Sequence, residues 1–195
     1  MPDFKAILGL ISVILGVVAF IPYLNDTLRG KTLPHVYTWF AWGLITLVAF
    51  AMQITSGAGA GSWVTLTAAL MAFIIFVLGI RKGKKDVTKI DTFFFITALL
   101  ALFLWIVVKQ PTVSAILLVS VGIFSFVPTL RKSWNKPFTE TLSTYAINTL
   151  RHLISFFALS QYSFLTGFFP VVWGTTNILF VMILIIRRKK FSNFN

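Results

Sequence analysis

Long apolar stretches that contain no Asp, Glu, Lys or Arg dominate the pattern of hydrophobic and polar positions along the chain. A bilayer core about 30 Å thick needs roughly 20 apolar residues per helix. Six stretches of about this length predict membrane-spanning helices: Ala6–Leu24, Val36–Ile54, Ser62–Ile80, Thr92–Val108, Pro111–Leu130 and Phe164–Ile186. A seventh stretch, Thr141–Ser160, is apolar except for Arg151 and His152. We therefore expect an all-α transmembrane protein whose seven helices cross the membrane.

The first of these stretches could instead be a cleaved signal peptide. Its apolar run is longer than the roughly 7–15 residues of a signal peptide's apolar region. No small-x-small cleavage site follows Leu24. We therefore expect this stretch to remain in the chain as the first crossing.

The composition excludes the soluble classes of protein. Apolar residues make up 57% of the 195 residues and charged residues 11%, against roughly 45–50% and about 25% in a soluble domain. So few charges cannot cover the exterior of a water-soluble fold, and a disordered chain lacks this apolar mass. The chain has no cysteine, which excludes disulfides, thiolate catalysis and cysteine-based metal sites.

The basic residues predict the orientation of the chain. With the N-terminus outside, alternate connections and the C-terminal tail place fourteen of the seventeen Lys and Arg residues inside and leave only Lys5 and Lys109 outside. This bias predicts a multi-pass protein of the cell membrane with a cytoplasmic C-terminus. The same bias accounts for the net charge of +12, because basic residues on the inner side set the topology and contact anionic headgroups. We therefore expect the lipid bilayer to be a partner of the protein, and we expect no binding to nucleic acid. The inner residues are Arg29, Lys31, Arg81, Lys82, Lys84, Lys85, Lys89, Arg131, Lys132, Lys136, Arg187, Arg188, Lys189 and Lys190.

The chain also contains an internal repeat. Phe20-Ile21-Pro22 and Phe126-Val127-Pro128 each end an apolar stretch and precede a basic loop and a helix with polar and aromatic residues. Three crossings end on the opposite side of the membrane, so a second copy in the same orientation needs one extra crossing. This predicts two parallel triple-helix bundles joined by a linker helix. The expected units are residues 1–86 for the first repeat, 87–109 for the linker, 110–190 for the second repeat and 191–195 for the tail.

Phe-x-Pro at the end of a first helix, a short basic loop and a polar-aromatic second helix resemble the PQ-loop repeat. The arrangement of three, one and three helices resembles the SWEET sugar transporters of that superfamily. In place of the glutamine that follows the proline in the family, this chain has Tyr23 and Thr129. The resemblance implies alternating access, with Pro22 and Pro128 as hinges. It also implies that a tryptophan and an asparagine near the bundle centre contact the solute; the matching pairs are Trp173 with Asn177 and Trp63 with Thr67.

Polar and aromatic residues at helical spacing in the apolar stretches predict a central cavity, because polar side chains avoid lipid. One alternative is that some of them, such as Thr46, Thr67 and Ser155, only hydrogen-bond between helices. Another is that Trp39 and Trp42 belong to the interfacial belt. The candidate substrate-binding residues are Trp42, Trp63, Thr67, Asn148, Arg151, His152, Trp173 and Asn177.

Arg151 is the most informative of these residues. It lies near the middle of its stretch, where an arginine costs roughly 2.5–3.5 kcal/mol on insertion scales. No acidic residue lies in any apolar stretch, so an internal ion pair is not expected. We hypothesise that Arg151 and His152 make the cavity positive and favour a carboxylate or other anion over a neutral sugar. The alternative is that Arg151 solvates a buried carbonyl or snorkels.

These features predict a transporter of a small polar or anionic solute, such as a sugar, amino acid or carboxylate. The alternative is a non-transporting receptor or assembly protein on the same fold. We expect no enzyme, metal or cofactor, because His35 and His152 lie far apart and no acidic residue is available to orient either imidazole. Two repeats can form a whole pathway in one chain, and a homo-oligomer is the alternative.

Overall fold

Seven α-helices form the fold of the described residues. The computed structural model describes residues 3–30, 34, 36–82, 89–135 and 137–192, and these residues contain no strand. Two short 3₁₀ helices, η1 (Gly59–Ser62) and η2 (Pro137–Thr139), occupy connections. Each helix overlaps a predicted span, and the all-α prediction is confirmed for the described residues. The helices are α1 (Phe4–Leu28), α2 (Val36–Thr55), α3 (Trp63–Lys82), α4 (Lys89–Ile106), α5 (Pro111–Asn135), α6 (Leu142–Phe157) and α7 (Phe164–Ser192).

Some of the sequence predictions concern positions outside the described residues. They include the proposed boundary between the first repeat and the linker, at residues 86 and 87. The remaining ones concern His35, Lys31, Lys84, Lys85 and Lys136.

The length and hydropathy of three helices indicate a membrane protein. The segments Phe4–Leu28, Gly59–Arg81 and Phe164–Ser192 are each long and apolar enough to cross a bilayer, and Trp39–Thr55 and Pro111–Phe124 are shorter apolar segments. Large apolar side chains such as Leu10 and Ile185 are exposed on the outer faces of these helices. A surface of this kind suits contact with acyl chains.

Three helices continue beyond the apolar stretches that predicted them. α1 ends at Leu28, α5 at Asn135 and α7 at Ser192, so Asn25–Leu28 and Arg131–Asn135 are helical and were wrongly assigned to connections. Hydropathy marks the edge of the lipid, whereas a helix stops where its backbone is broken. In α1 the break is Gly30, whose φ of 72° lies in the left-handed region.

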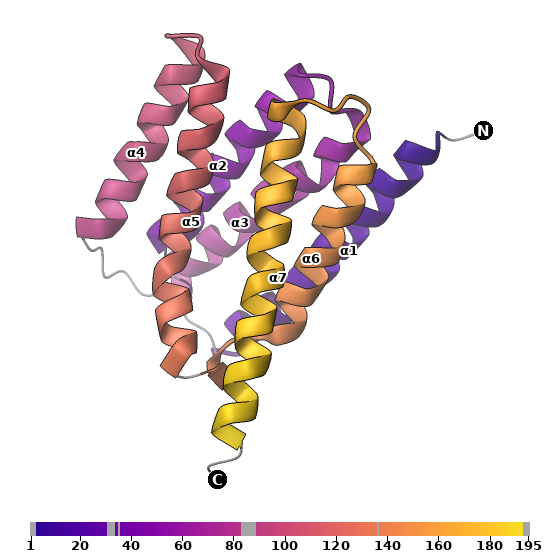
Figure 1. Ribbon diagram of the computed structural model, residues 1–195. Helices are drawn as coiled ribbons and strands as arrows, with labels where there is room; N and C mark the ends of the chain where they lie inside the picture. Colours follow the sequence, from indigo (N-terminus) through magenta and orange to yellow (C-terminus); the bar gives the residue numbers. More distant parts are fainter. Residues whose placement is uncertain (1–2, 31–33, 35, 83–88, 136, 193–195) are drawn as a thin grey trace.

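The first three and the last three helices pack in the same order. α3 packs against α1 and α2, and α7 packs against α5 and α6. Contacts between the two sets also come in matching pairs: α1 with α6 and α5 with α2, then α3 with α6 and α7 with α2. α4 packs on α5 and α2, at the left edge of Figure 1, while α1 lies at the right edge. The two termini lie at opposite ends of the bundle (Figure 1).

Small residues let α1 approach its neighbours closely. Gly9, Ser12, Gly16 and Ala19 recur on one face of α1, and all are buried. A Cβ atom on Gly9 would lie 2.7 Å from the Cβ of Ala60 and 2.8 Å from its carbonyl oxygen. This face therefore has no room for larger side chains, and the interface of α1 with α6 is more extensive than that of α2 with α5.

At one end of the bundle, the connection between α2 and α3 is bound to the connection between α6 and α7. We call this contact between residues 56–62 and 158–163 the clasp. The backbone N–H of Ser160 donates to the carbonyl oxygen of Ala58 at 3.0 Å. Nearby, Gln53 Nε2 donates to the carbonyl oxygen of Thr166 at 3.1 Å, and Lys5 Nζ donates to that of Leu159 at 2.7 Å. The clasp thus joins the first three helices to the last three through main-chain atoms.

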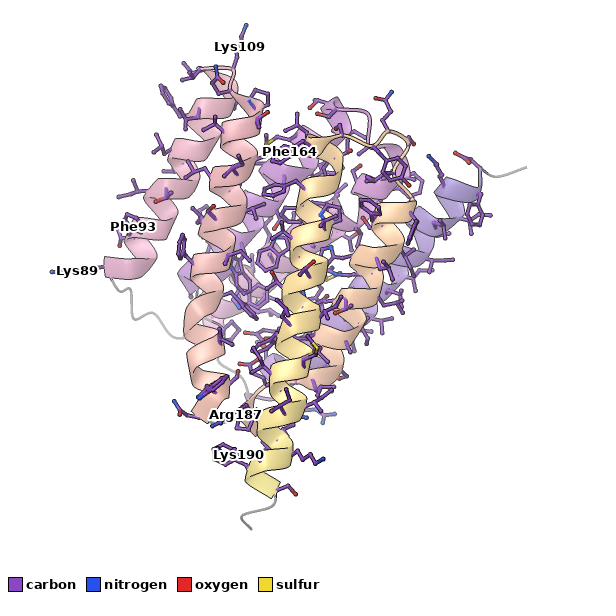
Figure 2. The ribbon with its side chains drawn as sticks, viewed as in Figure 1. Lys89, Phe93, Lys109, Phe164, Arg187 and Lys190 are labelled. Atoms are coloured by element: carbon purple, nitrogen blue, oxygen red, sulfur yellow. The ribbon has the colours of Figure 1, made fainter. Side chains whose placement is uncertain are left out.

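The opposite end of the bundle is basic. Figure 2 places Arg187 and Lys190 there, and Lys109 and Phe164 at the other end. Arg187 Nε donates to the carbonyl oxygen of Trp134 at 2.8 Å, and its guanidinium carbon lies 4.7 Å from the centre of the Trp134 ring. The end of α7 is thereby held against the end of α5.

Candidate functional site

The buried face of α6 carries the polar side chains that the sequence predicts there. Arg151 is 5% exposed, His152 is 4% exposed and Ser155 is fully buried. Asn148 is partly buried one turn earlier on the same face. Because α6 packs between α1 and α7, this face turns toward the interior of the protein and away from lipid.

Arg151 lies against α1. Its guanidinium carbon is 5.4 Å from the centre of the Phe20 ring, a cation–π contact. A Cβ atom on Gly16 would be 3.3 Å from Nη1, so the glycine leaves room for the guanidinium. Nε and Nη1 are both buried and have no hydrogen-bond partner in the described part of the chain. The alternative in which these nitrogens solvate a buried carbonyl therefore finds no support in the structure.

His152 and Asn148 complete the polar face of α6. The His152 ring meets the Phe169 ring of α7 edge-on, with 6.4 Å between centroids. Its Nδ1 and the Oδ1 of Asn148 are buried without a partner among the described residues. Both side chains therefore have unused hydrogen-bonding capacity inside the bundle.

The predicted pair on α7 lies inside the protein. Asn177 is 6% exposed, and its Nδ2 donates to the carbonyl oxygen of Trp173 at 2.7 Å. The Trp173 ring lies 6.1 Å from that of Phe169, so Phe169 contacts both Trp173 and His152. Trp173 Nε1 is buried and lacks a partner in the described chain. The indole is held in place while its single donor is unused.

Trp42 of α2 joins the two sets of three helices. It packs against a cluster that contains Phe20 and Trp39, and also against a cluster that contains Phe126 and Phe180. Its Nε1 is another buried donor for which the described residues provide no acceptor. Trp39 is buried and donates to the Tyr23 hydroxyl at 3.0 Å. Trp39 is therefore packed inside the protein, and Trp42 is partly buried between the two sets of helices.

Trp63 of α3 lies at the surface of the protein. It is 40% exposed, and its predicted role in solute binding stays a prediction. Trp63 is the first residue of α3, whereas its counterpart Trp173 lies well inside α7, so the two occupy different positions along their helices. Thr67 is partly buried, and its hydroxyl donates to the carbonyl oxygen of Trp63 at 3.0 Å, within its own helix.

Ser155 and Thr46 were predicted either to line a cavity or only to hydrogen-bond between helices, and their hydroxyls differ in the bonds that they make. Ser155 Oγ donates to the carbonyl oxygen of Gly61 at 2.7 Å, which links α6 to η1 as the interhelical alternative expects. Thr46 Oγ1 donates to the carbonyl oxygen of Trp42 at 2.6 Å and so stays within α2.

The predicted hinge prolines lie within continuous helices. Pro22 is inside α1 and Pro128 is inside α5. Proline removes one helical hydrogen bond and weakens the helix at that point. A further proline, Pro170, is buried inside α7 next to Phe169, and the sequence reasoning did not single it out.

Sequence reasoning also missed Gly16, Phe20 and Phe169, which surround Arg151 and His152. Gly9, Ser12 and Gly16 at helical spacing were an available signal, because small residues mark close helix contacts in membranes. Phe20 is the phenylalanine of the first Phe-x-Pro motif, which marked the repeat but did not place this ring beside Arg151. No comparable local signal distinguishes Phe169 among the twenty-one phenylalanines.

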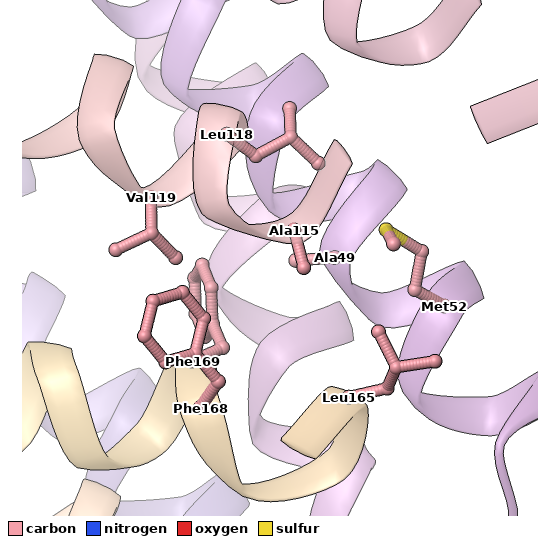
Figure 3. A pocket seen from close by; sticks show the side chains of 8 residues that line it. All are labelled: Ala49, Met52, Ala115, Leu118, Val119, Leu165, Phe168 and Phe169. Atoms are coloured by element: carbon pink, nitrogen blue, oxygen red, sulfur yellow. The ribbon is translucent and has the colours of Figure 1, made fainter. Parts of the chain in front are cut away.

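An apolar pocket lies beside these polar side chains, between α2, α5 and α7 (Figure 3). Its lining contains no charged or hydrogen-bonding side chain, so it does not suit a polar solute. Phe169 borders both the pocket and His152. The lining residues are Ala49, Met52, Ala115, Leu118, Val119, Leu165, Phe168 and Phe169.

We call the side chains of Trp42, Asn148, Arg151, His152 and Trp173 the polar cluster. Each has at least one buried polar atom with no partner among the described residues. The same part of the chain contains no group of three or more His, Cys, Asp or Glu residues that could hold a metal ion. The fold and this cluster define an all-helical membrane protein with a polar interior. Comparison with protein-family models, curated proteins and solved structures finds no match.

Proposed function

We propose that this protein is an integral membrane transporter of a small polar or anionic solute. The observation that carries the proposal is the polar cluster, in which Arg151 is buried with two unpartnered nitrogens. A buried polar atom without a partner costs about 1–3 kcal/mol, and more if it is charged. A protein stabilised only by packing gains nothing from several such atoms, whereas a transporter needs them to replace the hydration of its solute.

The packing of the helices supports two repeats that move relative to each other during transport. Under the proposal, α1–α3 form one repeat, α5–α7 form the other, and α4 is the linker. The matched contacts between the two sets of helices fit this division. Parallel repeats with a site between them near the midplane are a transporter architecture. Seven crossings with the N-terminus outside and the C-terminus in the cytoplasm also agree with termini at opposite ends of the bundle.

The clasp supports alternating access. Main-chain and side-chain hydrogen bonds close the end of the bundle that holds η1 and the α6–α7 connection. Under the orientation predicted by the basic loops, this is the outer end. Transport then requires the clasp to open, and Pro22 and Pro128 are the points where α1 and α5 bend most easily.

Solute flux in proteoliposomes tests the proposal. The purified protein is assayed for uptake of labelled glucose, alanine, lactate and succinate, and each rate is compared with that of Asn177→Ala and Trp63→Leu. We expect uptake of at least one solute, a drop of tenfold or more in Asn177→Ala, and no change in Trp63→Leu, whose side chain faces outward. Absence of flux for every solute, with the protein folded, would overturn the proposal.

A receptor or assembly protein on the same fold is the second candidate. The observation that favours it is that the unpartnered atoms of the polar cluster are all enclosed by the helices. An enclosed site can bind a solute without passing it on. Saturable binding without flux in the same preparation would support this candidate over the transporter.

A further inference from the structure

We propose that the polar cluster binds a small monocarboxylate anion and that Arg151 selects it. This inference rests on the proposed function, since it names the class of solute that the site would take. It goes beyond that function because a transporter of neutral sugars or amino acids would satisfy the proposal equally well.

The unpartnered atoms of the cluster are mostly donors. A guanidinium carries five N–H groups and accepts nothing, and an indole donates one N–H and accepts nothing. Arg151, Trp42 and Trp173 are therefore donors only. The cluster contains one unpartnered acceptor, the amide oxygen of Asn148. His152 Nδ1 can be a donor or an acceptor. A ligand that fits must accept more hydrogen bonds than it donates, and an ionised carboxylate only accepts.

Among the described residues the cluster has no counter-charge. The four acidic residues that the structure describes, Asp3, Asp26, Asp91 and Glu140, lie at or near helix ends. The one next to α6 in sequence, Glu140, accepts a hydrogen bond from the Tyr145 hydroxyl at 2.8 Å. Removing the partner from a buried charge is strongly unfavourable, whereas supplying one restores the pair. A solute carboxylate would supply it, and a neutral sugar would leave the guanidinium unpaired.

The charge of the site limits the charge of the ligand. Arg151 is the only Lys or Arg within α6. One guanidinium neutralises one carboxylate, while a dicarboxylate or inorganic phosphate would leave excess negative charge in a medium of low dielectric constant. Gly16 and Phe20 place the guanidinium beside α1, and α6 provides no second Lys or Arg to meet another anionic group. These constraints together select a monoanion.

Thermal unfolding of the full-length protein in detergent tests binding separately from transport. The ligands are acetate, lactate and pyruvate, with acetamide and lactamide as neutral controls of similar shape and succinate as a dianion. We expect lactate or another monocarboxylate to raise the melting temperature and the amides and succinate to leave it unchanged. Equal stabilisation by an amide, or no stabilisation by any monocarboxylate, would overturn the inference.

The variant Arg151→Met separates a ligand-binding arginine from a structural one. If Arg151 binds an anionic ligand, Arg151→Met removes an unpaired buried charge from the ligand-free protein. The variant then melts at the same or a higher temperature than the unaltered protein, and lactate no longer changes its melting temperature. If Arg151 is structural, the ligand-free variant melts at a lower temperature, which contradicts the inference. Arg151→Lys keeps the charge but not the planar donors, and we expect it to weaken lactate binding at least tenfold without abolishing it.

Flux measurements distinguish failure of this inference from failure of the proposed function. Uptake of labelled glucose without uptake of lactate would leave the transporter intact and overturn the anion site. Stabilisation by lactate without flux would support the anion site and contradict transport. Uptake of lactate that Arg151→Met removes would support both.

Discussion

Ser160 and Ala58 are joined through their main chains, with 3.0 Å between the N–H nitrogen of Ser160 and the carbonyl oxygen of Ala58. The two residues belong to connections in different halves of the chain. The side chains of Ala58 and of Leu159, which precedes Ser160, are fully buried. This contact is the point at which the proposed transporter must open on the outer side, and several measurable consequences follow from it and from the cluster beneath it.

The clasp should open during each transport cycle. The natural chain contains no cysteine, so Ala58→Cys with Ser160→Cys introduces one defined pair, and hydrogen-bonded backbones are close enough for a disulfide. We expect oxidation to reduce flux by at least tenfold and reduction to restore it, measured in proteoliposomes. Each single variant serves as the control. Full flux in the oxidised double variant would show that the clasp stays closed during transport.

The hydroxyl of Ser155 should contribute measurably to stability, because its hydrogen bond crosses from α6 to η1. Hydrogen bonds between membrane helices contribute about 0.6 kcal/mol on average and about 1.7 kcal/mol at most. We expect Ser155→Ala to lower the free energy of unfolding by an amount in this range. Thr67→Val is the matched control, since the Thr67 hydroxyl bonds only within α3 and should contribute little. A larger loss in Thr67→Val than in Ser155→Ala would contradict this assignment.

Gly9 and Gly16 should respond differently to a methyl group. At Gly9 the added Cβ would lie 2.8 Å from the backbone oxygen of Ala60, which cannot move aside, so Gly9→Ala should destabilise the protein by about 1–3 kcal/mol. At Gly16 the nearest atom is the end of the Arg151 side chain, which can shift. We therefore expect Gly16→Ala to change solute binding more than stability.

Gly167→Ala provides the control for both variants. Its Cβ would lie 3.4 Å from the Phe156 ring, an ordinary contact. Thermal unfolding and binding should both stay close to those of the unaltered protein. If Gly9→Ala is as stable as Gly167→Ala, the close approach of α1 to η1 is not as tight as described.

The two ends of the bundle should face opposite sides of the membrane. Gln110 and Ser192 are both exposed, and they lie in the α4–α5 connection and at the end of α7. We expect a membrane-impermeant maleimide to label Gln110→Cys in intact cells and to label Ser192→Cys only after permeabilisation. Labelling of both variants in intact cells would contradict the seven-crossing topology, and the reverse pattern would contradict the orientation.

The helices were predictable because lipid imposes a simple rule on sequence. A stretch without charges must form its backbone hydrogen bonds within itself, so each apolar run became a helix. The ends were less predictable, since α1 and α5 continue into polar residues on the basic side. Nothing in the hydropathy of Asn25–Leu28 distinguishes a helical turn from a loop, and the break at Gly30 is the decisive local feature.

The buried polar residues of α6 and α7 and Trp42 of α2 were predictable from the sequence, whereas the exposure of Trp63 and the contacts of Arg151 were not. Arg151, His152 and Asn177 are polar residues inside apolar helices, and burial between helices is the arrangement that avoids lipid. Trp63 was placed by analogy with Trp173, but a tryptophan tolerates an exposed position near the end of a helix. The contacts of Gly16 and Phe20 with Arg151 depend on the pairing of α1 with α6, which no local pattern of the sequence encodes.

The position of Arg151 has a consequence for the order in which the protein is built. The seven Leu, Ile and Phe residues of α6 each gain about 0.3–0.6 kcal/mol on insertion, while one arginine costs about 2.5–3.5 kcal/mol. As it leaves the ribosome, α6 therefore has almost no tendency to enter the bilayer by itself. It depends on the strongly apolar α7, which is synthesised after it, and on α1, which is already in place. Biogenesis of the second half is thus expected to be cooperative, with α6 and α7 entering the membrane as a pair.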